Sequence, residues 1–170
     1  MKRNFISLLA FLLGLNIYTQ IPNFPLDTTV RDASEFNLTD LEGNHYNSAD
    51  LKGDIVILNF WGIKCKPCVD EIPDLNSVVE EFNTSNVHFI GITNGSEDEL
   101  KEFLKEHPFS YIVCPTEDYK NLLIKFNTFP AVPVHMIIDK EWKIVYRYIG
   151  RFDPGSIEYF KRKIQSTLNN

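Results

Sequence analysis

The chain has 170 residues, 44% of them apolar, and a formal net charge of −6 at pH 7. This length and apolar content suffice for one domain with one sizeable core, and the negative charge argues against nucleic acid or anionic lipid as a partner. Three cysteines are too few for a small domain held together by disulfides.

The first 21 residues differ in kind from the rest of the chain. Lys2 and Arg3 precede an apolar run from Phe5 to Ile17, which is the pattern of a signal peptide. No Ala-x-Ala cleavage pattern precedes Pro22, so we predict either a signal peptide or an uncleaved N-terminal membrane anchor over residues 1–21. With either, we expect an exported protein that is periplasmic or anchored on the extracytoplasmic side of a membrane.

Residues 22–34 contain two prolines among mixed polar residues, and we expect a linker there. The domain itself is expected over residues 35–170. Its first element is a predicted β-hairpin, in which residues 36–38 and 45–46 flank a turn at residues 40–44. We expect this hairpin to extend the central sheet at its edge.

The stretch from Asp54 to Phe82 organises the domain. Its first part, residues 55–61, is an almost unbroken apolar run with β-branched residues, which predicts a strand buried on both faces. Apolar residues then recur at helical spacing and predict a helix: Ile72, Leu75, Val78, Val79 and Phe82. Cys65 and Cys68 stand where the strand turns into this helix, and Pro73 should kink it.

The remaining sequence alternates predicted strands with predicted helices. The strands are expected over residues 87–93, 111–114, 134–139 and 144–148, and the helices are expected to begin near Ser96, Thr116 and Asp153. This order predicts an α/β fold in which helices flank a mixed central sheet.

The two cysteines at the start of the predicted helix have a specific chemistry. Unpaired N–H groups and the helix dipole stabilise an anion there, so the Cys65 thiolate is favoured. Pro67 fits the start of a helix, and Lys64 and Lys66 favour the charged form of Cys65 further. Because Cys68 is close enough to form a disulfide with Cys65, we interpret the pair as a dithiol redox centre.

The block from Leu58 to Pro73, LNFWGIKCKPCVDEIP, resembles the active site of thioredoxin-superfamily oxidoreductases, and most closely the exported TlpA-like and ResA-like group. Ordinary thioredoxins usually have a buried aspartate six residues before the first cysteine, where this chain has Asn59. The ResA-like group instead has a glutamate three residues after the second cysteine, followed by an apolar residue and a proline, and residues 71–73 match this pattern. Lys64 departs from the family, in which an aromatic residue often precedes the first cysteine.

This resemblance implies a thioredoxin-like fold with an N-terminal β-hairpin extension over about residues 35–168. It also places the superfamily's cis-proline at Pro133, and so assigns the cis bond to Val132-Pro133. The implied partner-binding residues are Trp61, Val132 and Pro133, with the backbone of Val132 pairing with an extended segment of the partner.

We therefore expect a thiol-disulfide oxidoreductase that reduces disulfides of partner proteins. Cys65 attacks the partner disulfide as a thiolate, and Cys68 resolves the resulting mixed disulfide. Because Cys68 must lose a proton, a nearby carboxylate is a suitable acceptor, and the family pattern assigns this role to Glu71. The implied partners are disulfide-containing or dithiol proteins and an upstream electron donor, and cytochrome c maturation is one role that the resemblance allows.

The same residues allow other functions. A structural zinc site needs four ligands, and no second pair at the required spacing exists, so we predict neither metal nor cofactor. Copper delivery through Cys65, Cys68 and His135 is an alternative, although a buried core histidine is commoner in an apolar strand. A thiol peroxidase would have a threonine where Gly62 stands. Cys114 is either a buried thiol, which is the more common case, or a third redox-active sulfur.

Overall fold

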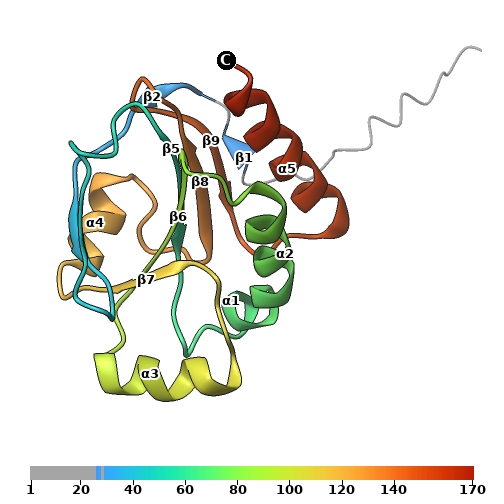
Figure 1. Ribbon diagram of the computed structural model, residues 1–170. Helices are drawn as coiled ribbons and strands as arrows, with labels where there is room; N and C mark the ends of the chain where they lie inside the picture. The colour runs from blue at the N-terminus through green and yellow to red at the C-terminus, as the bar shows by residue number, and fades with distance from the viewer. Residues whose placement is uncertain (1–25, 28) are drawn as a thin grey trace, which may run out of the picture.

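The computed structural model describes residues 26–27 and 29–170, and it contains a mixed central sheet with helices on both faces (Figure 1). The strands of this sheet are β1 (Leu26–Asp27), β2 (Arg31–Asp32), β5 (Ile55–Phe60), β6 (Val87–Thr93), β7 (Ile112–Pro115), β8 (Val134–Ile138) and β9 (Lys143–Ile149). Their order is β1-β9-β8-β5-β6-β7, with β2 also paired to β9. β5, β6 and β7 run parallel, whereas β8 and β9 are antiparallel to their neighbours. The predicted mixed sheet is confirmed.

Five helices surround the sheet within the described residues. They are α1 (Lys66–Asp70), α2 (Ile72–Phe82), α3 (Glu97–Glu106), α4 (Tyr119–Lys125) and α5 (Pro154–Leu168). α2 and α5 pack side by side on one face of the sheet, α4 covers the other face, and α3 lies at the end of the sheet near α1 (Figure 1). None of these helices is long and apolar enough to cross a bilayer.

Strand β5 lies in the middle of the sheet and is buried along its whole length. Val56, Leu58 and Phe60 join the apolar cluster on the α4 face, whereas Ile55 and Ile57 join the cluster formed with α2 and α5. This alternation is the two-residue period of a strand. The prediction of a strand buried on both faces is therefore confirmed. The segment with the two cysteines follows this strand directly in the sequence.

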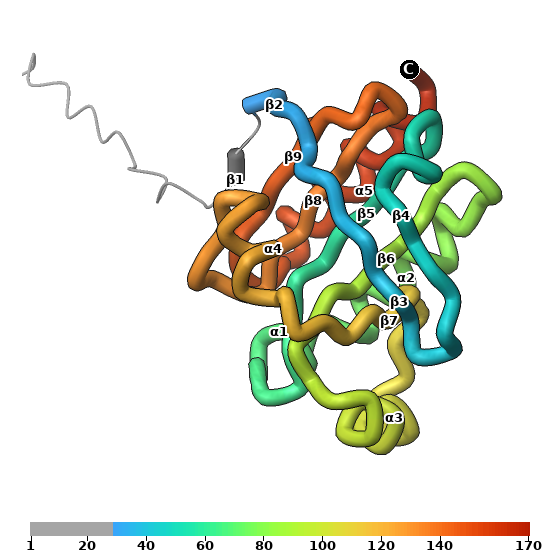
Figure 2. Tube along the Cα trace, turned by 90° about the vertical axis from the view of Figure 1, so that its left-hand side faces the viewer, coloured from blue at the N-terminus to red at the C-terminus, as the bar shows by residue number. Residues whose placement is uncertain are grey.

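The predicted N-terminal hairpin is present, but its expected place at the sheet edge is wrong. β3 (Asn37–Thr39) and β4 (His45–Asn47) form a separate two-stranded sheet. Phe36 and Leu38 are buried in the cluster on the α4 face of the central sheet. The hairpin therefore lies across that face, as the turned view shows (Figure 2), because burying these two side chains requires face-to-face packing rather than edge pairing.

The edge strand β9 pairs instead with chain that precedes the hairpin. Leu26 is paired with Tyr148, and Arg31 with Ile144. The second half of the expected linker, residues 22–34, is thus attached to the sheet. The N-terminal segment, residues 1–21, lies outside the described residues.

The helix that follows the cysteines is broken rather than kinked. In a continuous helix the N–H of residue 73 would donate to the carbonyl of Val69, and Pro73 has no N–H. The N–H of Glu71 donates to that carbonyl instead and ends α1. A new helix then starts, with the N–H of Leu75 donating to the carbonyl of Glu71 at 3.0 Å.

Two helix starts show how well capping residues can be located from sequence. Ser96 begins α3 with a capping box to Glu99, and Asp153 begins α5 by accepting the N–H groups of Gly155 and Ser156 at 2.8 Å. Thr116, the expected start of another helix, instead accepts the N–H of Asp118 at 3.1 Å in the turn before α4. The N-terminal capping position of that helix is Asp118, two residues later than predicted.

Candidate active site

Cys65 and Cys68 form a disulfide at the junction of β5 and α1. Cys65 is the N-terminal capping residue of α1, and the N–H of Cys68 donates to its Sγ at 3.3 Å. Cys65 remains partly exposed, whereas only 1% of Cys68 is exposed. The pair thus consists of an outer sulfur that a partner can reach and an inner sulfur that it cannot.

Lys64 and Lys66, which flank Cys65, each form an ion pair with a carboxylate. Lys66 donates to both carboxylate oxygens of Asp70 at 2.8 Å, and Lys64 lies 3.8 Å from Glu99. Both lysine side chains are strongly exposed, so solvent screens their charge. The backbone N–H of Cys68, which donates to the Cys65 sulfur, is the group in direct contact that would stabilise a Cys65 thiolate.

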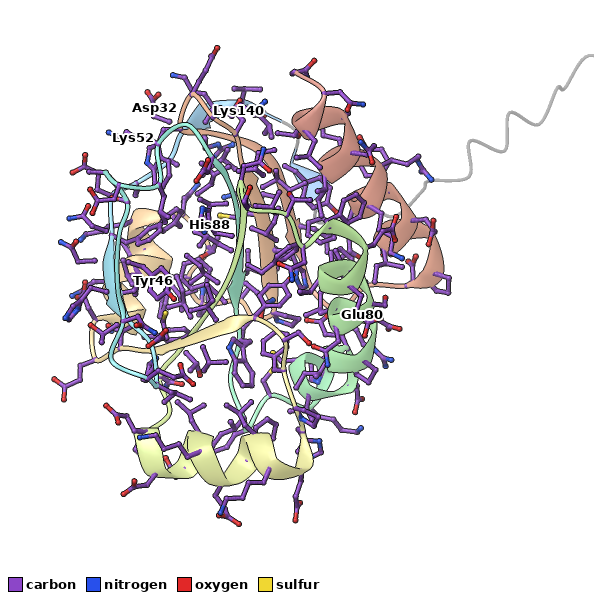
Figure 3. All side chains as sticks on the ribbon, viewed as in Figure 1. Asp32, Tyr46, Lys52, Glu80, His88 and Lys140 are labelled. Carbon is purple, nitrogen blue, oxygen red and sulfur yellow. A yellow bond between two sulfur atoms is a disulfide. The ribbon has the colours of Figure 1, made fainter. Side chains whose placement is uncertain are left out.

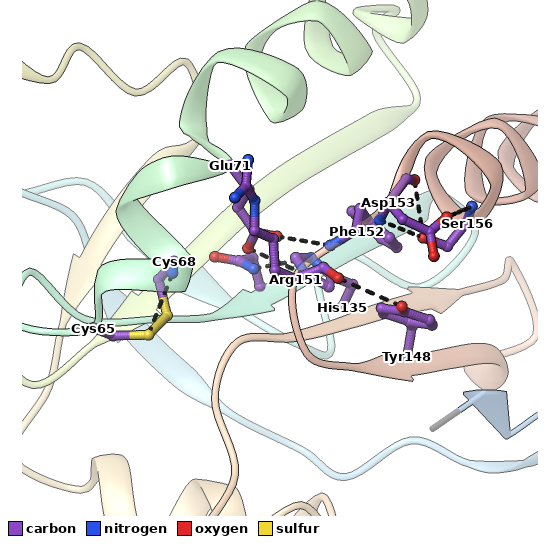
Figure 4. A network of polar contacts seen from close by, with 10 residues as sticks. Cys65, Cys68, Glu71, His135, Tyr148, Arg151, Phe152, Asp153 and Ser156 are labelled. Atoms are coloured by element: carbon purple, nitrogen blue, oxygen red, sulfur yellow. Dashed lines mark hydrogen bonds and ion pairs between the residues drawn. A yellow bond between two sulfur atoms is a disulfide. The ribbon is translucent and has the colours of Figure 1, made fainter. Parts of the chain in front are cut away.

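Glu71 lies between the disulfide and His135 in the close view (Figure 4). Its side chain is fully buried, with Oε1 3.2 Å from Nε2 of His135. The N–H of Phe152, in the loop between β9 and α5, donates to Oε2 of Glu71 at 3.3 Å. The Glu71 carboxylate therefore points into the interior, and its role toward Cys68 stays a prediction.

Asp70, the residue before Glu71, has the opposite environment. Its carboxylate is partly exposed and contacts Lys66 and, at 3.8 Å, Arg151. The hydrogen bond from Lys66 is the main cause of its lowered pKa. Asp70 is therefore an ionised surface group, and the neighbouring carboxylate alone reaches the interior.

The sequence suggests His135 only as a core residue or copper ligand. In the structure, its Nδ1 is 3.0 Å from Nδ2 of Asn59, which is its register partner on β5. Its ring stacks on that of Phe152, with centroids 4.1 Å apart. Each ring nitrogen of His135 thus faces a protein side chain other than the two cysteines. Among the described residues, no group of three or more His, Cys, Asp or Glu is arranged to hold a metal ion.

The loop before β8 contains the cis peptide bond predicted at Val132-Pro133, and a second one at Phe129-Pro130 that was not predicted. Val132 and Cys65 line the same open cavity of about 310 Å³, together with Trp61. The loop and the outer sulfur therefore face a common space.

Trp61 forms the inner wall of this cavity rather than an exposed surface, since only 1% of the residue is exposed. Its indole packs edge-on against Phe109, with ring centroids 5.2 Å apart, and near Phe103. Its backbone carbonyl accepts the hydroxyl of Tyr119 at 3.0 Å. Trp61 therefore belongs to the buried side of the site, in the same apolar cluster as Cys68.

Cys114 lies apart from this arrangement as a free, fully buried thiol. Burial, with the nearby charges of Asp40 and Glu42, raises the pKa of Cys114 to about 12. This environment matches the expected buried thiol and not a third redox-active sulfur.

Sequence reasoning missed the contacts of Glu71 with His135 and Phe152. Asn59 and His135 were visible as polar residues inside apolar strands, which is the one signal in the sequence that pointed to them. Their pairing depends on the register of β5 against β8, and the contact with Phe152 depends on where the loop after β9 lies. Neither can be read from the spacing of residues along the chain.

Comparison with known proteins gives consistent results. The AhpC/TSA family matches residues 30–147. Thiol-disulfide oxidoreductase ResA of a Bacillus cereus strain is 33% identical over 135 residues, covering 79% of this chain and 77% of that protein. The ResA protein of Bacillus subtilis (strain 168) is 29% identical over 135 residues, covering 79% and 74% respectively.

Solved structures show the same fold. A thioredoxin family thiol:disulfide interchange protein from Chlorobium tepidum TLS superposes with a TM-score of 0.68 at 26% identity, covering 84% of this chain and 99% of that one. A thiol:disulfide interchange protein from Bacteroides sp. gives a TM-score of 0.69 at 23% identity, covering 84% and 91%. The thioredoxin-like fold expected from the sequence is confirmed.

Proposed function

Because this chain belongs to the AhpC/TSA family and is a thiol-disulfide oxidoreductase of the ResA-like group, we propose that it reduces disulfides of partner proteins outside the cytoplasm. The observation that carries the proposal is the unequal exposure of the two sulfurs. A partly exposed Cys65 at a helix start, linked to a buried Cys68, is suited to one attacking and one resolving thiol.

In the first step, the Cys65 thiolate of the reduced protein attacks one sulfur of the partner disulfide. A bond forms between Cys65 and that sulfur, and the other partner sulfur leaves as a thiolate. The N–H of Cys68, which points at the Cys65 sulfur, stabilises the attacking anion.

In the second step, Cys68 loses its proton and attacks the Sγ of Cys65. The disulfide of the oxidised protein forms, and the partner leaves with both of its sulfurs reduced. Glu71 is the proposed acceptor of the Cys68 proton, since it follows Cys68 by three residues and has its carboxylate buried on the same side.

The partner's chain is proposed to enter the cavity lined by Cys65, Trp61 and Val132. An extended segment there would pair with the backbone beside Pro133 while presenting its disulfide to Cys65. Trapping of partners tests the assignment of Cys65 as the attacking sulfur and Cys68 as the resolving sulfur. A Cys68→Ser variant retains the attacking sulfur but cannot resolve, so it should accumulate mixed disulfides that a Cys65→Ser variant does not form.

The direction of electron flow has its own test. A reductase is kept reduced by its electron donor, so acid quenching of growing cells, followed by alkylation of the unfolded protein, should label Cys65 and Cys68 as free thiols. A pair found mainly as the disulfide would instead indicate an oxidase.

Export is tested with residues 1–34 fused to a reporter enzyme that folds only where disulfides form. Reporter activity is expected with the natural segment and not when Lys2 and Arg3 are kept but the apolar run from Phe5 to Ile17 is deleted. Equal activity of the two fusions would contradict the proposed location.

A further inference from the structure

Two titratable side chains face each other in the interior beside the cysteine pair, and the proposed mechanism uses only one of them. Glu71 and His135 are both fully buried, with Oε1 and Nε2 3.2 Å apart. A buried carboxylate stays ionised only when a donor or an opposite charge compensates for its lost hydration. Within the described residues, His135 is the titratable side chain at ion-pair distance from the Glu71 carboxylate.

The partners of His135 indicate where its proton lies. Nδ2 of Asn59 is a donor and lies 3.0 Å from Nδ1 of His135, so Nδ1 accepts. A neutral ring then carries its hydrogen on Nε2, which faces the carboxylate of Glu71. This assignment rests on the contact of Asn59 with Nδ1, since Nε2 of His135 and Oε1 of Glu71 lie at ion-pair distance but form no hydrogen bond within the described residues.

The side-chain amide of Asn59 can also pair with a His135 ring that carries hydrogen on both nitrogens. Oδ1 of Asn59 makes no hydrogen bond within the described residues, and rotation of the amide would present this oxygen to a hydrogen on Nδ1. The pair can thus take up one more proton, on Glu71 or on His135, without leaving Nδ1 unpaired.

The pair is also held in place. The N–H of Phe152 donates to Oε2 of Glu71 at 3.3 Å, and the Phe152 ring stacks on His135. Both contacts come from the loop that leads into α5, so one residue fixes the carboxylate and the imidazole together. An acceptor with fixed geometry is what proton transfer from a buried thiol requires.

Other polar groups around the pair do not compete for this proton. Burial, together with the charge of Glu71, raises the pKa of Tyr111 far above neutral, so this phenol stays neutral. Tyr148 on β9 is the register partner of His135, and its hydroxyl donates to the carbonyl of Arg151 at 3.5 Å. The Arg151 guanidinium itself contacts Asp70 at the surface.

We propose that Glu71 and His135 act as one buried proton acceptor for Cys68, in which His135 positions the carboxylate and shares the proton. This inference rests on the function proposed above. When Cys65 is linked to a partner, the S–H bond of Cys68 breaks and its proton passes to the Glu71–His135 pair. The Cys68 thiolate then attacks Sγ of Cys65, the Cys65–Cys68 bond forms, and the partner sulfur leaves with the electron pair of the broken bond and takes a proton from solvent.

The two steps can be followed separately with an aromatic disulfide that releases a coloured thiolate at each exchange. Attack by Cys65 gives the first release and attack by Cys68 gives the second. In the reduced protein, His135→Gln should leave the first release unchanged and slow the second at least tenfold near pH 7, since acid–base catalysis commonly contributes about 10²- to 10⁴-fold. The second release should recover as pH rises toward about 8 to 9, where Cys68 ionises without help.

A matched control is available in His88→Gln. His88 also pairs with a carboxylate, Asp54 at 2.8 Å, but it lies near the start of β6, at the end of the sheet opposite the cysteines (Figure 3). This control should show both releases at wild-type rates. The double variant Glu71→Gln/His135→Gln should resolve within about twofold of Glu71→Gln alone, since residues that act as a unit are non-additive.

The outcomes separate this inference from the proposed function. A wild-type protein without a second release would contradict the role of Cys68 itself. If the wild type gives both releases, a His135→Gln variant that resolves at the wild-type rate would contradict the shared acceptor and leave the proposed function intact. The same holds if the rate losses of the two single variants multiply in the double variant.

A measurement on the unmodified protein keeps the inference testable if the variant does not fold. Nitrogen-15 chemical shifts of the His135 ring report which nitrogens carry hydrogen. In the oxidised protein we expect a hydrogen on Nε2 and a bare Nδ1, and we expect the shifts to change on reduction. A neutral ring with its hydrogen on Nδ1 in the oxidised protein, or shifts that do not change on reduction, would contradict the proposal.

Discussion

Two adjacent carboxylates show how strongly the environment of a residue decides its chemistry. Asp70 lies at the surface against Lys66, whereas Glu71 is buried against His135. They have nearly the same intrinsic acidity, so sequence alone separates them only through the three-residue spacing from Cys68. The structure adds a physical difference, because the Glu71 carboxylate is buried while that of Asp70 is partly exposed, and this burial supports the proposed role of Glu71.

The first prediction compares these two residues. Glu71→Gln keeps the shape of the side chain but removes the proton acceptor, so the Cys65 mixed disulfide should accumulate near neutral pH and resolve as pH rises toward about 8 to 9. Asp70→Asn should resolve like the wild type. Rapid acid quenching followed by mass spectrometry measures the mixed disulfide, and equal amounts in both variants from about pH 6 to 9 would contradict the role of Glu71.

The second prediction concerns the third cysteine. Because Cys114 is fully buried and burial is the main cause of its pKa of about 12, alkylation of the native reduced protein at pH 7 should label Cys65 first and leave Cys114 unmodified. Cys114 should react only when the protein is unfolded in urea. Peptide mass mapping before and after unfolding makes the comparison, and rapid native labelling of Cys114 would show that it is accessible.

At the scale of elements, the N-terminal hairpin depends on one side chain in its turn. Oδ1 of Asp40 accepts the N–H groups of Glu42 and Asn44, and Oδ2 accepts the side chains of Asn44 and Tyr46. Burial alone would raise the pKa of Asp40, but these hydrogen bonds outweigh it and hold the pKa below its usual value. The ionised aspartate is therefore bound more tightly by the folded hairpin than by the unfolded chain.

The third prediction follows from this lowered pKa. Asp40→Asn should lower the free energy of unfolding by about 1 to 3 kcal/mol at pH 7, the usual loss for hydrogen bonds to a charged group. The wild-type advantage is complete above the unfolded pKa of about 4 and is lost as pH falls through the lower folded value. Urea unfolding from pH 3 to 7 tests this, with exposed Asp50→Asn as the control expected to change little.

Elements were predicted well where local chemistry determines them. Ser96 and Asp153 have side chains that satisfy the first N–H groups of the following helices, and such contacts span only three residues. The break at Glu71 was underestimated because a proline can either bend or end a helix. Glu71 is the residue between the two helices, and its contact with His135 joins parts of the chain that are far apart in sequence.

At the scale of the whole molecule, the central strand joins two apolar clusters on opposite faces of the sheet. This layering was predictable, because an unbroken apolar strand must be covered on both sides. Two other features could not be predicted from the sequence. They are the packing of the hairpin on a face of the sheet and the pairing of β1 and β2 with β9. Both depend on contacts between parts of the chain that are far apart in sequence.

The fourth prediction tests the core on one side of this strand. Ile57 is fully buried in the cluster with α2 and α5, so Ile57→Ala should lower the free energy of unfolding by about 2 to 5 kcal/mol through lost burial and a residual cavity. Val30→Ala is the control, since Val30 is 61% exposed and should change stability by less than about 0.5 kcal/mol. Similar losses for both variants in urea unfolding would contradict this account of the core.

The position of Trp61 beneath the cysteine pair also has an optical consequence. Its indole shares an apolar cluster with Cys68, whereas Trp142, the second tryptophan, packs against Phe36 on the α4 side of the sheet. A nearby disulfide quenches an excited indole by accepting an electron from it, and a pair of thiols does so less well. Fluorescence from Trp61 should therefore brighten when the pair is reduced while that of Trp142 stays constant, so the protein reports its own oxidation state without a label.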